Sequence, residues 1–283
     1  MFPTPIQKAS PAARAAYKVG LPVALFVWLL PLVAIFMTSI RPGGDITMGN
    51  VFGWPSDFRL LENYVAVFRE SQAARYFLNS VLITVPTVIL SVSLACLAGY
   101  GLAIYRFRMA LPLFFLFVAG NFVPFQILMV PVRELSVQTG LYNEVWGLVL
   151  FHAAFQTGFC TLFMRNFIRA LPHELIESAR IEGVGELRIF WHLVLPLVRP
   201  AIAALAVLVF TFVWNDFFWA TVLTQGEEAK PITAGVRALN GQFVSRWHLV
   251  SAASLLAAVP PVLMFFLMQR HFIAGLTLGA TKG

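Results

Sequence analysis

Charged residues are scarce in this chain. They make up 12% of its 283 residues, whereas hydrophobic residues make up 59%. Soluble globular domains have about 25% charged residues. A water-soluble fold of this size needs more polar surface than the chain supplies, so a very apolar soluble enzyme is the disfavoured alternative. The composition predicts a membrane protein.

Cysteine is also rare. Cys96 and Cys160 are the two cysteines, and both lie inside apolar runs. No metal-ligand spacing and no disulfide framework is visible. We therefore expect two small buried side chains and no metal site.

A third absence concerns the energy source. A phosphate-cradling P-loop needs a Gly-Lys dipeptide followed by Ser or Thr, and no Gly-Lys dipeptide occurs in the sequence. Energy for any active process must come from another chain or from an ion gradient.

Long apolar runs dominate what is present. About 20 apolar residues cross a hydrocarbon core of about 30 Å as a helix. The sequence predicts an all-α membrane protein whose permease region, residues 19–272, has six spans at about 19–40, 77–104, 110–132, 144–164, 200–223 and 249–268. Residues 1–18 and 273–283 are predicted tails. The first run is too long for the apolar part of a signal peptide, and no small-x-small cleavage site follows it, so we expect it to be retained.

The net charge of +7 reflects topology rather than nucleic-acid binding. With the N-terminus inside and six spans, twelve of the 20 lysines and arginines fall on the cytoplasmic side. Cytoplasmic loops carry an excess of Lys and Arg. Both termini and the polar stretch of residues 171–196 are therefore expected in the cytoplasm.

Polar side chains inside the predicted spans mark a bundle interior or a pathway. The candidates are Asn121, Gln126, His152, Gln156, Asn215 and Asp216. His152 and Gln156 are four residues apart and share a helix face; for His152 we expect a helix–helix hydrogen bond. Asp216 needs a partner, for which we expect Asn, Trp or Arg, and it should shape the fifth span. A stripe of small residues in the second predicted span predicts close helix packing. It comprises Ser80, Thr84, Thr87, Ser91, Ala95 and Ala98.

The stretch of residues 171–196 is predicted to form two short helices. Pro172 suits a first helical turn, Glu174 and Glu177 complement the positive end of the helix dipole, and Gly183 suits the left-handed position just past the helix end. The first helix is thus about residues 173–182. The second is predicted to present an apolar stripe made of Leu187, Phe190, Trp191 and Val194. On physical grounds the first helix either docks in a groove of a partner protein or lies passively at the membrane surface.

A spacing pattern favours docking. Glu177-Ser178-Ala179, three residues, Gly183, nine residues, Leu193, one residue and Leu195-Pro196 resembles the EAA loop of ATP-binding-cassette (ABC) importer permeases. Ser178 and Leu193 depart mildly from that pattern. Nearly the whole chain is similar to the smaller six-span subunit of maltose-type sugar permeases, through Asn79-Ser80, Ala98-Gly99-Tyr100, Arg106-Phe107, residues 179–183, residues 214–217 and Gly275-Leu276-Thr277.

The resemblance implies a permease of the bacterial inner membrane that takes up a sugar or sugar-like solute by alternating access. Its partners would be a homologous second permease, two ATP-binding subunits that hold ATP and Mg, an extracytoplasmic solute-binding protein and the lipid bilayer, with no nucleic acid and no cofactor in this chain. The implied contacts with the ATPase are His173, Glu174, Glu177, Ser178, Ala179, Arg180, Glu182 and Gly183. The C-terminal tail would also reach the ATPase. The implied contacts with the binding protein are Asn240, Gly241, Gln242 and Arg246.

Two other functions remain as alternatives. An ion-coupled secondary transporter could use Asp216 and His152 as a proton relay, although Asp216 is nearly alone as an acid within the spans. An intramembrane enzyme would need a catalytic constellation. None is visible, since Asp216 and His152 lie on different predicted spans.

Overall fold

A computed structural model describes residues 10–120, 122–239 and 246–280. In these ranges the chain forms helices joined by turns, with no strand, as the composition predicts. The chain divides into two compact units. The N-terminal unit comprises the residues up to Ser71 together with Leu239–Leu256, and the central unit comprises Gln72–Ala238 together with the residues from Ala257 onward.

The N-terminal unit contains α1 (Pro11–Ser39), α2 (Gly43–Thr47), α3 (Leu60–Arg69) and the start of α14 (Trp247–Ala280), which continues into the central unit. α1 begins within the predicted tail of residues 1–18, because the Ser10 side chain accepts a hydrogen bond from the Ala13 N–H at 3.3 Å and Pro11 suits the first helical position.

The turn after α1 is fixed by buried polar groups. The Arg41 side chain, 1% exposed, donates to the carbonyls of Met37 and Gly53 at 3.2 Å each and to that of Asn50. Asn63 of α3 donates to the carbonyls of Ser39 and Arg41 at 2.9 Å. Buried carbonyls thus find donors, which a turn away from water requires.

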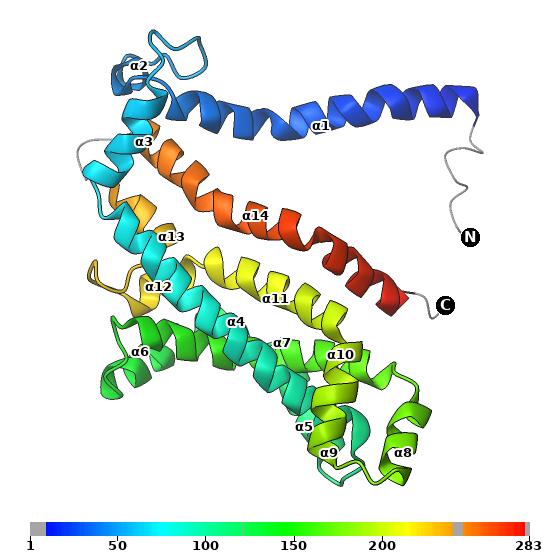
Figure 1. Ribbon diagram of the computed structural model, residues 1–283. Helices are drawn as coiled ribbons and strands as arrows, with labels where there is room; N and C mark the ends of the chain where they lie inside the picture. Colours follow the sequence, from blue (N-terminus) through cyan, green and yellow to red (C-terminus); the bar gives the residue numbers. More distant parts are fainter. Residues whose placement is uncertain (1–9, 121, 240–245, 281–283) are drawn as a thin grey trace. The chain divides into compact units, whose positions relative to one another are not determined.

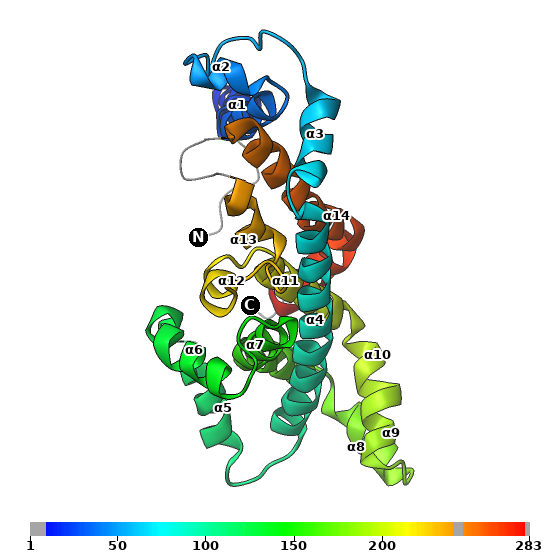
Figure 2. The same cartoon turned by 90° about the vertical axis from the view of Figure 1, so that its left-hand side faces the viewer.

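The central unit holds the remaining helices. They are α4 (Ala73–Ile104), α5 (Ala110–Gly120), η2 (Phe125–Leu128), α6 (Met129–Gln138), α7 (Val145–Arg169), α8 (His173–Ile181), α9 (Glu186–Ile189), the π-helical η3 (Phe190–Val194), α10 (Leu195–Leu197), α11 (Arg199–Trp214), α12 (Phe218–Leu223) and α13 (Ile232–Val236), with η4 (Arg237–Leu239) ending it. α4 packs along α7, and α11 packs against both (Figures 1 and 2).

Small residues bring α4 close to α7 and α11. The predicted stripe is buried as expected: Ser80, Thr84, Thr87, Ser91 and Ala95 are each at most 1% exposed, and Ala98 is half-buried. A Cβ on Gly99 would lie 2.9 Å from the backbone nitrogen of Arg165, so the approach of the two helices requires glycine there. In lipid, such close van der Waals packing is a main source of helix association.

Two of the six predicted spans are not single straight helices. Among the described residues, α1, α4, α7 and Trp247–Gln269 of α14 are each long and apolar enough to cross a membrane. The predicted third span, residues 110–132, is divided between two helices: α5 ends at Gly120, and the chain resumes as a helix at Phe125, after Pro124, which has no N–H to donate.

The predicted fifth span, residues 200–223, is also divided between two helices. α11 ends at Trp214 and α12 starts at Phe218. Asn215 turns its side chain back to the Thr211 carbonyl at 2.9 Å, and Asp216 begins a new helix. Short polar side chains that hydrogen-bond to nearby backbone favour such breaks.

Candidate coupling site

α8 is the helix predicted between the fourth and fifth spans, and its C-terminal end is sharply defined. Gly183 has φ +81°, its N–H donates to the Arg180 carbonyl at 3.0 Å, and the Val184 N–H donates to the Ala179 carbonyl at 3.0 Å. These two bonds form a Schellman motif with glycine in the left-handed position. The predicted end of the helix and the predicted conformation of Gly183 are confirmed.

α8 has one buried face and one exposed face. Ile176 is 3% exposed and belongs to the core formed by α4, α7 and α11. Ile181, at the end of α8, is 86% exposed, and Leu187 at the start of α9 is 74% exposed. A polar helix gains nothing by leaving two large apolar side chains in water, so this tip is suited to burial against another surface.

The residues predicted to contact an ATPase all lie on α8 or in the two residues that follow it. His173, Glu174, Glu177, Ser178, Arg180, Glu182 and Gly183 are exposed, and Ala179 is half-buried. The structure thus presents these groups together on one short, capped helix that lies beside α9 (Figures 1 and 2).

The stripe predicted for the second helix is only half buried within this chain. Phe190 and Val194 are buried, but Leu187 and Trp191 are 74% and 60% exposed. The reason is that η3 is a π-helix, which has more residues per turn than the 3.6 on which the prediction rests. Pro196 follows η3 and has no N–H to donate. The side chains of this region that pack in the core are Ile189, Phe190 and Val194.

Sequence reasoning missed Glu186, the residue that ties the loop together. Its carboxylate accepts hydrogen bonds from Arg180 Nε at 2.6 Å and Nη2 at 3.2 Å, from the Tyr100 hydroxyl at 2.9 Å and from the Tyr105 hydroxyl at 2.7 Å. We call these four residues the Glu186 clamp. It joins α8 and the start of α9 to the end of α4, where Tyr105 and Tyr100 lie 81 and 86 residues before Glu186 in the sequence. A signal existed, since Glu186 occupies the first turn of a helix that follows Gly185, where acids are favoured.

The clamp fixes the charge of Glu186. The hydrogen bond from Arg180, assisted by those from Tyr105 and Tyr100, lowers the pKa of Glu186 to about 2 against an opposing effect of burial. Burial, and then the neighbouring Glu186, raise the pKa of Tyr105. The carboxylate therefore stays ionised and the Tyr105 hydroxyl stays protonated at neutral pH. Charge-assisted, partly bidentate hydrogen bonds of this kind are the strong ones in proteins.

A second polar contact lies at the break between α11 and α12. His152 Nε2 is 3.5 Å from Asp216 Oδ2, and the Asp216 carboxylate accepts from the N–H groups of Trp219 at 3.3 Å and Ala220 at 2.9 Å. Asp216 therefore caps α12 and pairs with His152 of α7. His152 thus contacts the break between α11 and α12, and the helix–helix hydrogen bond expected of it stays a prediction. The side chain that pairs with Asp216 is a histidine, where Asn, Trp or Arg was expected.

The other polar candidates are not part of this contact. Gln126 is exposed, Gln156 is half-buried, and Asn215 bonds within its own helix. Asn121 lies outside the described residues. Of the described candidates, the structure brings together His152 and Asp216.

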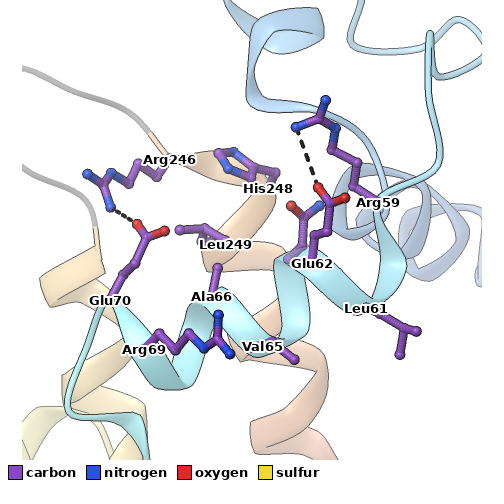
Figure 3. A pocket seen from close by; sticks show the side chains of 11 residues that line it. Arg59, Leu61, Glu62, Val65, Ala66, Arg69, Glu70, Arg246, His248 and Leu249 are labelled. Atoms are coloured by element: carbon purple, nitrogen blue, oxygen red, sulfur yellow. Dashed lines mark hydrogen bonds and ion pairs between the residues drawn. The ribbon is translucent and has the colours of Figure 1, made fainter.

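The N-terminal unit contains a cavity of about 600 Å³ between α3 and the start of α14. Figure 3 shows Arg246 directed at Glu70, with which it forms an ion pair, while Arg59 pairs with Glu62 at 3.5 Å. Arg246 is thus in contact with α3. Asn240, Gly241 and Gln242, the other residues predicted to contact a binding protein, lie outside the described residues.

No metal centre is visible in the described part of the chain. It contains no group of three or more His, Cys, Asp or Glu side chains placed to hold an ion. Cys96 and Cys160 are buried free thiols, as their apolar surroundings in the sequence predict.

Comparisons with known proteins agree with this geometry. The family described as "Binding-protein-dependent transport system inner membrane component" matches residues 71–277. The chain is 36% identical, over 91% of its length and 88% of the relative's, to the "Osmoprotective compounds uptake permease protein GgtD" of Synechocystis. It is 31% identical, over 98% of its length and 99% of the relative's, to the "Arabinooligosaccharides transport system permease protein AraQ" of Halalkalibacterium halodurans.

A solved structure shares the fold. One chain of a bacterial ABC transporter involved in the import of the acidic polysaccharide alginate matches with a TM-score of 0.80 and 24% identity, covering 93% of this chain and 99% of that one. This likeness shows that the two chains share a fold.

Proposed function

Because this chain belongs to the family of binding-protein-dependent transport system inner membrane components, we propose that it is the permease subunit of an ABC importer for a sugar or sugar-like solute. It is a multi-pass inner-membrane protein that serves transport. The observation that carries the proposal is α8, a capped helix with a buried anchor at Ile176 and an exposed apolar tip at Ile181.

The proposed partners follow from the family and from the sequence. A homologous second permease would complete the pathway, two ATP-binding subunits would hold ATP and Mg, and an extracytoplasmic binding protein would deliver the solute. The sequence has no Gly-Lys dipeptide, which supports placing ATP hydrolysis on other subunits. The distribution of Lys and Arg supports cytoplasmic termini and a cytoplasmic α8.

We propose that force enters at α8 and reaches the spans by two routes. Closure of the ATP-binding subunits would move α8. Ile176 passes that movement to the core, and the Glu186 clamp passes it to the end of α4. The break between α11 and α12, capped by Asp216, supplies a point where the fifth span can change its bend.

The solute class rests on the relatives. Their names mention osmoprotective compounds, arabinooligosaccharides, and melibiose, raffinose and stachyose. An oligosaccharide or a glycoside is therefore the proposed cargo. The cognate binding protein should rise in Tm with one member of a sugar panel and with few others, because a ligand that binds the folded state alone stabilises it by mass action.

The test of coupling uses Gly183. A Cβ there meets nothing within 4 Å, so Gly183→Leu creates no clash. The substitution acts through the backbone conformation, because an L-residue adopts φ +81° at a cost of roughly 1–2 kcal/mol. Gly185 also has open space, but its φ is −66°, so Gly185→Leu is the matched control. In proteoliposomes with the ATP-binding subunits and binding protein, Gly183→Leu should lower solute taken up per ATP, and Gly185→Leu should not. Equal, normal coupling in both variants would refute the role of α8.

The contact between His152 and Asp216 is what a proton relay would need first. However, Asp216 already accepts two backbone N–H groups as the cap of α12, and the family uses a separate binding protein. The ion-coupled alternative is therefore set aside in favour of the importer.

A further inference from the structure

A group of positive side chains in the central unit lines a cavity of about 1070 Å³ beside α8. The cavity lies between residues 102–111, the C-terminal end of α7 and the coupling helix. Its lining includes the arginines Arg106, Arg108, Arg165, Arg169 and Arg180, together with His173 and a single carboxylate, Glu177. We call it the arginine cavity.

Two of the five arginines are already engaged. Arg180 is held by Glu186 in the clamp at 2.6 Å. The Arg165 guanidinium lies 4.0 Å from the centre of the Phe114 ring and donates to the Leu102 carbonyl at 3.3 Å. These contacts fix two positive side chains at the wall of the cavity.

The other three arginines have no such partner. Arg106, Arg108 and Arg169 are exposed and form no ion pair within 4.0 Å with any described residue. Glu177 offsets one positive charge and Glu186 another, so three positive charges remain. Arginine presents its donors in a planar fork that matches a phosphate group.

The same cavity has an apolar side. Leu102, Ala103, Ile104, Phe107, Ala110 and Leu111 line it, and Leu111 is 60% exposed. The exposed apolar surface continues along α5 through Phe115 and Leu116, at 57% and 68%. An acyl chain would find an apolar path there, whereas a free anion or an acidic protein segment would leave it uncovered.

We propose that the arginine cavity binds the phosphate of an anionic phospholipid head group, with the acyl chains lying along α5. This rests on the proposed orientation, which places the cavity at the cytoplasmic membrane surface. Basic pockets between membrane helices on that side bind anionic head groups. Because α8 contributes His173, Glu177 and Arg180 to the lining, a bound lipid contacts both the coupling helix and the α4–α5 turn.

The test measures lipid binding directly. The purified transporter, with its partner subunits in neutral detergent, is titrated with phosphatidylglycerol and with phosphatidylcholine, and bound lipid is counted by native mass spectrometry. Phosphatidylglycerol should bind more tightly. Removing a charge-assisted hydrogen bond weakens binding by a factor of about ten or more, so Arg106→Gln/Arg108→Gln and, separately, Arg169→Gln should each lose at least about tenfold.

Arg188→Gln is the matched control, since Arg188 is an exposed arginine of α9 that does not line the cavity. It should leave lipid binding unchanged. Copurification of the ATP-binding subunits with each variant shows that the loop is folded, and Arg169→Lys should retain part of the binding because the charge remains.

Several outcomes would overturn the proposal. They are equal binding of the two lipids, no effect of the cavity variants, or displacement of phosphatidylglycerol by inorganic phosphate at similar concentration. Loss of the ATP-binding subunits from the cavity variants, with lipid binding intact, would assign the cavity to the partner protein. ATP-driven uptake is measured separately, so failure of lipid binding leaves the proposed function standing.

Discussion

Replacing Glu186 by Gln should loosen α8 from α4 without unfolding the transporter. The substitution keeps the size of the side chain but removes its charge, so the bonds from Arg180, Tyr100 and Tyr105 lose their charge assistance. A carboxyl pKa near 2 instead of 4.5 sets an upper limit of about 3 kcal/mol on the stabilisation of the ionised form. The Glu186 and Arg180 side chains are 40% and 38% exposed, and solvent screening reduces that to about 1–2 kcal/mol.

A loss of that size lowers the ratio of attached to detached loop by roughly 5- to 30-fold. We therefore expect Glu186→Gln to hydrolyse ATP in the complex while transporting less solute for each ATP. The assay is the ratio of uptake to hydrolysis in proteoliposomes containing the ATP-binding subunits and the binding protein.

A double-mutant cycle assigns the effect to the clamp. Arg180→Gln should lower the coupling ratio as Glu186→Gln does, and the double variant should add little to either, because the two side chains act as one contact. The control cycle pairs Glu186→Gln with Arg188→Gln. Arg188 lies two positions along and forms no ion pair with a described residue, so those effects should add. Additive effects in the first cycle, or normal coupling in Glu186→Gln, would refute the reasoning.

Three further predictions concern pH, docking and the broken fifth span. Because the pKa of Glu186 is depressed in the folded protein, the stabilisation it provides is complete above the ordinary pKa of 4.5 and is lost as pH falls toward 2. Titration of Glu186 should therefore leave the ratio of uptake to ATP hydrolysis constant between about pH 5.5 and 8. A pH-dependent change in that range that disappears in Glu186→Gln would contradict the assignment. Ile181→Ala should weaken copurification of the ATP-binding subunits with little change in Tm, whereas Ile176→Ala, at a buried site, should cost about 2–5 kcal/mol of stability; the opposite pattern would mean that the faces of α8 are misassigned. Asp216→Ala should cost about 0.5–2 kcal/mol of stability and lower Tm through loss of the α12 cap, with Asn215→Ala, at an exposed position, as the control. Asp216→Asn keeps a capping side chain and should leave the pH profile of uptake unchanged; a shifted pH profile would restore a proton role.

The sequence predicts the class of the fold and the coupling helix well, because both depend on local patterns. Apolar runs of membrane length mark the helices, and Gly183 marks the end of α8 through a conformation that glycine adopts most easily. The burial of the Ser80–Ala95 stripe also follows from its spacing.

The remaining features do not follow from apolar periodicity. The breaks at residues 120–125 and 214–218 depend on Pro124 and on the side chains of Asn215 and Asp216, which bond to nearby backbone groups. The π-helical winding of η3 shifts the buried face away from Leu187 and Trp191. In the Glu186 clamp, Glu186 contacts Tyr105 and Tyr100, which lie 81 and 86 residues earlier in the sequence. No local pattern connects these positions.

The two attachments of α8 determine which movements it can pass on. Ile176 and Arg180 are four residues apart and so lie on the same side of the helix, one turn from each other. A helix attached at one point can rotate about that point. A helix attached at two points along one side can rotate only if one of the two attachments breaks. Torque applied at Ile181 would therefore be carried to α4 and α7 as a tilt of the whole assembly. The chain would respond to a partner's push in one direction far more stiffly than in others.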